Sequence, residues 1–156
     1  LRCSRIRTLT VIEYCDAVIG WHERELFPDT AGLAADDRVA LVCGDFFVAA
    51  MDGVGFDPNR PGRTYDAILL DIDHSPRHLL HDPHAPFYTA AGLHCASSRL
   101  VPGGVFAMWS DDPPDDGFSA LLDSVFTDVE ARTVWFDNPL TRDRSAATIY
   151  LATRRQ

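Results

Sequence analysis

The chain has 156 residues, of which 46% are hydrophobic and 24% charged, and these values predict a single globular domain over residues 1–156. Its formal net charge is −9 at pH 7, which argues against a nucleic-acid partner because nucleic-acid backbones favour basic surfaces. Its apolar runs are too short to span a membrane and no signal peptide is recognisable, so we expect no membrane partner.

Strand-like and helix-like segments alternate along the chain. The expected strands are 6–13, 38–43, 65–72, 105–110, 129–136 and 146–152, and the expected helices are 16–27, 46–51, 87–99 and 118–126. This alternation predicts an α/β, Rossmann-like fold with a mostly parallel sheet flanked by helices on both faces. The last two strands predict an antiparallel hairpin at the edge of that sheet.

Three of the expected strands end in acidic residues: Glu13, Asp45 after Gly44, and the pair Asp71 and Asp73. In open α/β sheets, ligands bind in the crevice beyond the carboxyl ends of the strands. Strand alternation would place Asp71 and Asp73 on the same side of their strand. These strand ends therefore predict one ligand crevice lined by carboxylates.

Each acid has a functional and a structural interpretation. Glu13 could accept the two hydroxyls of a ribose, or it could favour a helix N-terminus through the helix dipole. Asp45 could accept an adenine amino hydrogen, or it could cap the following helix. Asp71 and Asp73 could bind a cationic amine and accept its proton, or they could be a solvated pair that ends the strand.

A polar loop over residues 73–86 contains four histidines, namely His74, His78, His81 and His84. Their spacing matches no zinc signature, and prolines within the loop interrupt any helix that would align the rings. We therefore expect no metal site. Exposed histidines, or a lid over the crevice, are the preferred interpretations.

The four cysteines are isolated and form no CxxC motif. Free thiols in a reducing cytosol are the simplest explanation, so we expect a cytoplasmic protein. All 14 basic residues are arginine, which excludes both a Schiff-base lysine and a P-loop lysine.

Taken together, these motifs resemble the catalytic domain of the spermidine synthases, which are polyamine aminopropyltransferases. The matching segments are VIE at 11–13, VCGD at 42–45, YDAILLD at 65–71, FYT at 87–89 and RLVPGG at 99–104. The resemblance implies a class I methyltransferase-like fold. It also implies transfer of an aminopropyl group from decarboxylated S-adenosylmethionine to a polyamine, with release of methylthioadenosine, in an enzyme that is usually a homodimer.

The resemblance also implies roles for individual residues. Glu13 resembles the acid that holds the ribose hydroxyls, and Asp45 resembles the acid that contacts the adenine amine. Asp71 resembles the acid implicated in deprotonating the attacking amine, which must be neutral to attack the sulfonium in line. The implied cofactor-binding residues are Glu13, Gly44, Asp45 and Phe46, and the implied substrate-binding residues are Asp73, His74 and Tyr88.

The chain also departs from the family pattern. Where the family has a second acid that helps to anchor the diamine, this chain has His74. The family's Glu-Ile-Asp is replaced by Glu13-Tyr14-Cys15. The glycine-rich cofactor loop and the N-terminal β-domain of the family do not lie within these 156 residues. In this architecture they would precede Leu1, so an N-terminally incomplete domain is one interpretation. These departures favour an acceptor other than putrescine.

Three other functions compete with aminopropyl transfer. A methyltransferase that uses S-adenosylmethionine would have the same fold and the same ribose acid. A nicotinamide dehydrogenase also places an acid at this strand end, but Gly44-Asp45 and the Pro102-Gly103-Gly104 turn favour the adenosylmethionine type. The third possibility is a non-catalytic domain that binds a nucleoside or serves as a dimer partner.

Overall fold

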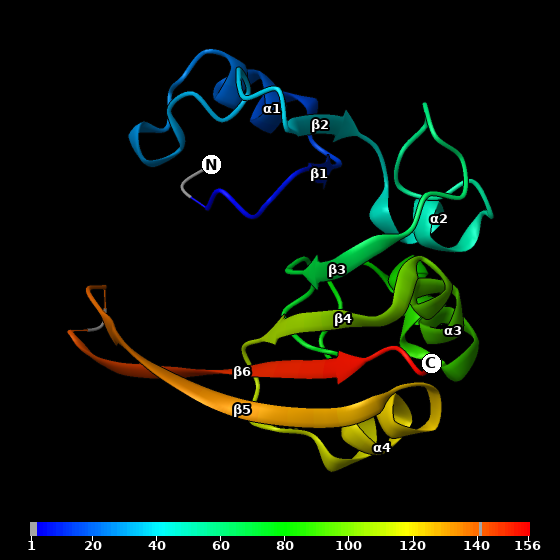
Figure 1. Ribbon diagram of the computed structural model, residues 1–156. Coiled ribbons are helices and arrows are strands. Elements are labelled where there is room, and N and C mark those ends of the chain that lie inside the picture. Colours follow the sequence, from blue (N-terminus) through cyan, green and yellow to red (C-terminus); the bar gives the residue numbers. More distant parts are fainter. Residues whose placement is uncertain (1–2, 141) are drawn as a thin grey trace. The chain divides into compact units, whose positions relative to one another are not determined.

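Two groups of paired strands build the protein, and they lie in different parts of the chain (Figure 1). The computed structural model describes residues 3–140 and 142–156. It divides into an N-terminal unit, Leu1–Arg63, and a C-terminal unit, Thr64–Gln156. The expectation of one domain over residues 1–156 stays a prediction.

The N-terminal unit contains a two-stranded parallel sheet. Its elements are β1 (Leu9–Glu13), α1 (Asp16–Glu23), the 3-10 helix η1 (Pro28–Thr30), β2 (Val39–Cys43) and α2 (Phe46–Met51). The two strands run in register from Leu9 opposite Val39 to Glu13 opposite Cys43. Helix α1 lies in the connection between them, as a parallel pair requires.

Helix α1 is shorter than the predicted helix over 16–27. It ends at Glu23, and Glu25 has a φ of 55°, a left-handed conformation that an α-helix cannot continue through. Pro28 then begins η1. The apolar residues beyond Glu23 have helical spacing, but the backbone turns away before it reaches them.

The C-terminal unit is a four-stranded mixed sheet with two α-helices. Its elements are β3 (Tyr65–Leu70), the 3-10 helix η2 (Asp82–Tyr88), α3 (Ala90–Ser98), β4 (Leu100–Ser110), α4 (Asp116–Val125), β5 (Thr127–Asn138) and β6 (Asp143–Thr153). The strand order is β3-β4-β6-β5, with β3 parallel to β4 and β6 antiparallel to both of its neighbours. The α/β fold with a C-terminal antiparallel edge hairpin is therefore confirmed.

Alternate residues of β3, β4 and β6 form the core of the C-terminal unit. The buried side chains on these strands include Ile68, Leu70, Phe106, Met108, Tyr150 and Ala152. Helices α3 and α4 pack against each other and against the sheet. The Phe118 ring meets Tyr150 edge-on at 5.0 Å between centroids, and Phe106 stacks on Phe126 at 5.7 Å.

Strand β4 is longer than the predicted strand over 105–110, because it begins at Leu100 and includes the Pro-Gly-Gly segment. The partner of Tyr65 is Leu100, whereas the partner of Ala67 is Val105, so the register shifts across this segment. Gly103 has a φ of +77°, which glycine adopts without strain. The turn residues thus form an irregularity inside a strand instead of a turn before it.

Helix α3 begins at Ala90, three residues later than predicted. The preceding segment forms η2, which contains Pro86. Thr89 is the N-cap, and its hydroxyl accepts a hydrogen bond from the Gly92 amide at 3.2 Å. Within the described ranges, no helix is long and apolar enough to cross a bilayer.

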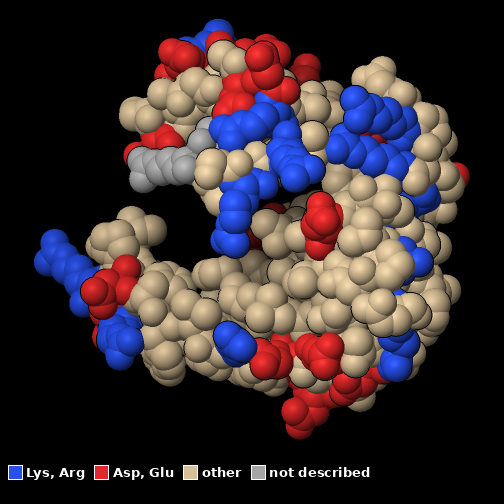
Figure 2. All heavy atoms as spheres, in the orientation of Figure 1, with Lys and Arg blue, Asp and Glu red and all other residues tan. Residues whose placement is uncertain are grey.

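The β5–β6 hairpin extends past the end of β4. Pairing of β4 with β6 stops at Ser110 opposite Thr148, whereas β5 and β6 pair as far as Asn138 opposite Asp143. Figure 2 shows side chains of both charge signs at the hairpin tip, at the left of the view. The Arg144 guanidinium lies 5.4 Å from the Trp135 ring centroid, so a cation–π contact joins the two strands of this extension.

Candidate functional site at the strand ends

The carboxyl ends of β1 and β2 lie side by side in the N-terminal unit. Glu13 is the last residue of β1, and its partner across the sheet is Cys43. The Gly44 amide donates a hydrogen bond to the Glu13 carbonyl at 3.0 Å. The backbone therefore brings Glu13 and the Gly44-Asp45 segment to one sheet edge, as predicted for neighbouring parallel strands.

Glu13 and Asp45 are both held by local backbone donors. Glu13 Oε1 accepts from the Cys15 amide at 2.7 Å. Asp45 Oδ1 accepts from the Phe47 and Val48 amides at 2.8 and 3.1 Å and so caps α2. Within the described chain, Glu13 Oε2 and Asp45 Oδ2 make no hydrogen bond. Each carboxylate is thus oriented through one oxygen, and its other oxygen remains available to a ligand.

The two residues that flank Asp45 differ in what they offer a ligand. A Cβ atom added to Gly44 would have no heavy atom within 4 Å, so the space beside this backbone is open. The Phe46 side chain is buried, and its ring stacks on Phe56 with 5.0 Å between centroids. Phe46 therefore offers a ligand its main chain, while its side chain belongs to the core.

Asp71 and Asp73 follow β3 and lie in different environments. Strand β3 ends at Leu70, so the alternation expected to place both acids on one side does not continue to Asp73. Asp71 is exposed, whereas the Asp73 side chain is only 1% exposed. The two acids therefore differ in burial, and the expectation that they face the same side stays a prediction.

The Asp73 carboxylate is saturated by three donors of its own loop. It accepts from the Leu80 amide, His84 Nδ1 and the Tyr88 hydroxyl, each at 2.8 Å. Asp73 and Tyr88 were both predicted to bind substrate. In the structure the Tyr88 hydroxyl donates to the buried Asp73 carboxylate, and this hydrogen bond connects the two ends of the loop. Burial, and then the adjacent Asp73 carboxylate, raise the pKa of Tyr88 well above its ordinary value of 10.0.

This raised pKa predicts a specific loss of stability in alkali. Because the folded state favours the protonated phenol, its contribution is complete below the unfolded-state pKa near 10 and is lost as the pH rises above it. We expect the free energy of unfolding to fall less steeply between pH 9 and pH 11 in Tyr88→Phe than in the wild type. Urea denaturation at several pH values measures these slopes, and parallel slopes would contradict the assignment.

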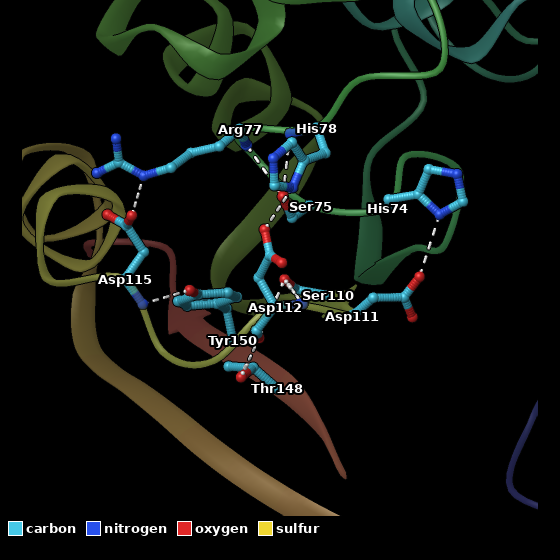
Figure 3. Close-up of polar contacts among 10 residues, drawn as sticks. All are labelled: His74, Ser75, Arg77, His78, Ser110, Asp111, Asp112, Asp115, Thr148 and Tyr150. Atoms are coloured by element: carbon cyan, nitrogen blue, oxygen red, sulfur yellow. Dashed lines mark hydrogen bonds and ion pairs between the residues drawn. The ribbon is translucent and has the colours of Figure 1, made fainter. Parts of the chain in front are cut away.

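The loop after β3 is joined to the loop after β4 by three polar side-chain contacts, shown in Figure 3. His74 Nδ1 lies 3.1 Å from Asp111 Oδ2, and His78 Nδ1 lies 2.8 Å from Asp112 Oδ2. In the third pair, Arg77 Nε contacts Asp115 Oδ2. The histidine-containing loop over residues 73–86 and the acidic loop over residues 111–115 thus form one polar surface at the carboxyl ends of β3 and β4.

These contacts stabilise the charged form of two acids. A hydrogen bond from Ser75, followed by the contact with His78, holds the pKa of Asp112 below its usual value. The Arg77 guanidinium, followed by the Phe118 amide, lowers the pKa of Asp115. Both acids therefore stay ionised at neutral pH.

Strand β6 supports the acidic loop from beneath (Figure 3). The buried Thr148 hydroxyl donates to the Asp112 carbonyl at 2.7 Å, and the Tyr150 hydroxyl accepts from the Asp115 amide at 2.8 Å. The buried Ser110 hydroxyl accepts from the Asp112 amide at 3.2 Å. The loop that carries the acids is thus fixed to the sheet.

The sequence motifs assigned no role to residues 111–117. The signal was available, since Asp111 and Asp112 follow the carboxyl end of β4 as Asp71 follows β3. Among residues 3–140 and 142–156, no group of three or more His, Cys, Asp or Glu side chains is placed to hold a metal ion.

The predicted site residues fall in both units. Glu13, Gly44 and Asp45 belong to the N-terminal unit, while Asp71 and His74 belong to the C-terminal unit. The single crevice expected to join them stays a prediction.

Several solved structures share the fold of this chain. Spermidine synthase from Thermotoga maritima matches with a TM-score of 0.60 and 18% identity over 94% of this chain and 45% of that protein. A probable spermidine synthase from Corynebacterium glutamicum matches with a TM-score of 0.59 and 21% identity over 92% of this chain and 46% of that protein. The N-methyltransferase NodS from Bradyrhizobium japonicum matches with a TM-score of 0.56 and 11% identity over 96% of this chain and 67% of that protein.

These matches show a spermidine synthase-like, class I methyltransferase-like fold. The chain spans less than half the length of the spermidine synthases that it matches. No protein-family model matches the sequence, and no curated protein matches it either.

Proposed function

We propose that this protein is a transferase that takes its group from an adenosine-containing sulfonium, and that the group is the aminopropyl moiety of decarboxylated S-adenosylmethionine. The supporting observation is the pair of oriented carboxylates at adjacent strand ends. Glu13 and Asp45 are each fixed by backbone amides through one oxygen, with the second oxygen available. Two fixed acceptors with open space beside Gly44 suit a nucleoside, which presents hydroxyl and amino donors.

The N-terminal unit would hold the nucleoside through Glu13 and Asp45. Glu13 Oε2 would accept from the ribose hydroxyls, and Asp45 Oδ2 would accept from the adenine amine. The main chain of Gly44 and Phe46 would lie against the ring. The sulfonium, when bound, supplies an electrophilic carbon and a neutral thioether leaving group.

The C-terminal unit would receive the acceptor. Asp71 is an exposed carboxylate directly after β3, and it is proposed to contact the attacking group and to favour loss of its proton. The acidic loop beside it, with Asp111 and Asp112, favours a cationic amine such as a polyamine. Asp73 and Tyr88 would act indirectly, by holding the loop that presents Asp71 and His74.

A methyltransferase is the second candidate. The methyltransferase neighbours have TM-scores close to those of the spermidine synthases, and the same nucleoside acids would serve S-adenosylmethionine. The two reactions release different products. Aminopropyl transfer releases methylthioadenosine, and methyl transfer releases S-adenosylhomocysteine.

Product binding tests this proposal. We expect calorimetric titration to show tighter binding of methylthioadenosine than of S-adenosylhomocysteine. Glu13→Gln is expected to weaken methylthioadenosine binding about tenfold, because an amide cannot accept both ribose hydroxyls as a carboxylate does. The matched control is Glu23→Gln, at the exposed end of α1, which should leave the affinity unchanged.

The alternatives give different titration results. A preference for S-adenosylhomocysteine would replace aminopropyl transfer with methyl transfer. Equal loss of affinity in both variants would remove Glu13 from the nucleoside site. Binding of neither nucleoside would contradict the proposed function. The proposed homodimer and cytoplasmic location are tested separately, by light scattering and by cell fractionation.

A further inference from the structure

One histidine of the polar surface is held in a defined orientation. His74 Nδ1 lies 3.1 Å from Asp111 Oδ2, and the Asp111 amide donates to the His74 carbonyl at 2.7 Å. The other carboxylate oxygen, Asp111 Oδ1, accepts from the Trp109 indole Nε1 at 3.1 Å. Contacts of its backbone and of its side chain therefore orient Asp111. Figure 3 shows the contact through which Asp111 orients the His74 imidazole.

This contact selects one tautomer of His74. An ionised carboxylate can only accept hydrogen bonds, so the proton on the neutral ring must lie on Nδ1. Nε2 then carries a lone pair, and in the part of the chain that the structure describes it makes no hydrogen bond. The side chains of His74 and Asp111 are 62% and 60% exposed, so an acceptor molecule can reach Nε2.

The other histidine pairs of the loop differ from this one. His84 contacts the buried Asp73, and its side chain is 16% exposed. His78 contacts Asp112, whose carboxylate is also engaged by Ser75. His74 is the member that lies three residues after Asp71, the proposed acceptor contact, and its acid is additionally held by Trp109.

We propose that His74 is the group that takes the proton from the acceptor, and that Asp111 and Trp109 are its positioning residues. The inference rests on the proposed function, and it assigns different roles to Asp71 and His74 at the acceptor site. Asp71 contacts the attacking group, and Nε2 of His74 removes its proton. An imidazole is a stronger base than a carboxylate, and base catalysis is most effective when basicity matches the working pH.

The step balances without any further reactant. The lone pair of the acceptor nitrogen forms the new bond to the carbon next to the sulfonium sulfur. The electron pair of the carbon–sulfur bond passes to the sulfur, which leaves as a neutral thioether. The proton of the acceptor nitrogen moves to His74 Nε2, and the resulting imidazolium is stabilised by Asp111.

Two further side-chain contacts join the same two loops, Arg77 with Asp115 and His78 with Asp112. His78 is therefore a matched control for His74, because it belongs to the same loop and also contacts an aspartate.

Nitrogen-15 NMR of the histidine rings tests the tautomer without any substrate. In the full chain at pH 9, with resonances assigned through His74→Gln, we expect His74 to be protonated on Nδ1 and unprotonated on Nε2. In Asp111→Ala, which removes the acceptor, this preference should be lost, while the His78 signals stay unchanged. Protonation on Nε2 in the wild type, or the same tautomer preference in Asp111→Ala, would overturn the proposal.

Turnover of decarboxylated S-adenosylmethionine with spermidine or another polyamine acceptor, measured as release of methylthioadenosine, tests the chemistry. His74→Gln is expected to lower kcat/KM about 100-fold, whereas His78→Gln should change it less than threefold. An unchanged kcat/KM in His74→Gln, or an equal loss in His78→Gln, would contradict the role of His74. The affinity of His74→Gln for methylthioadenosine separates the nucleoside site from the proposed role of His74 as a base. A loss of this affinity would show that His74 acts in nucleoside binding and not in proton transfer.

Discussion

Replacing Gly92 with alanine is expected to lower the free energy of unfolding of the C-terminal unit by about 3 kcal/mol. A Cβ atom at this position would lie 2.4 Å from the Pro86 carbonyl oxygen and 2.5 Å from the Phe87 Cα and carbonyl oxygen. These are backbone atoms, so no side-chain rotation relieves the contact. Helix α3 would have to move away from η2, which carries the fully buried Phe87 ring.

The same substitution in α1 provides the control. A Cβ atom at Gly20 would meet no heavy atom within 4 Å, and alanine is the better helix former by about 1 kcal/mol. Gly20→Ala should therefore leave stability unchanged or raise it slightly. Urea denaturation of both variants measures the difference, and a Gly92→Ala midpoint equal to that of the wild type would show that α3 and η2 can separate at little cost.

Replacing Asp73 with alanine is expected to destabilise the C-terminal unit by about 3–4 kcal/mol. The variant leaves the Leu80 amide, His84 Nδ1 and the Tyr88 hydroxyl without the acceptor that all three now share. The carboxylate is 1% exposed, so water cannot fully replace it. The loop over residues 73–88 should lose its packing first, because all three donors belong to it.

Asp71 is a matched control for Asp73 because it lies two residues earlier and is exposed. Asp71→Ala should change the free energy of unfolding by less than about 0.5 kcal/mol, although it is expected to impair turnover. Denaturation midpoints and turnover together separate the two acids. Equal destabilisation by both variants would contradict a structural role specific to Asp73.

Local signals were sufficient for the elements that depend on nearby residues. Helix α2 has the predicted bounds, because Asp45 supplies a cap and the following residues are apolar. The parallel pairs and the edge hairpin also follow the prediction, since apolar runs and turn residues are short-range properties of the chain. Glu13 and Asp45 come to one edge of the sheet because β1 and β2 are neighbouring parallel strands, as the sequence pattern predicted.

The bounds that differ from the prediction depend on contacts with distant residues. Helix α3 begins late because η2 occupies the preceding segment and packs closely on Gly92. Strand β4 begins early because Leu100 pairs with Tyr65, and the Pro-Gly-Gly segment adapts to that pairing. Neither the contact of η2 with Gly92 nor the pairing of Leu100 with Tyr65 can be read from the residues that immediately surround these positions.

The sequence by itself therefore determined the fold class, the edge hairpin and which acids stand at strand ends, because periodicity and capping act over a few residues. Only the tertiary structure decided which partners surround Asp73 and Asp111. Asp73 is buried by donors 7 to 15 residues away, and Asp111 meets His74 across 37 residues. Such partners are set by how strands and loops pack in space, and local patterns carry no information about that packing.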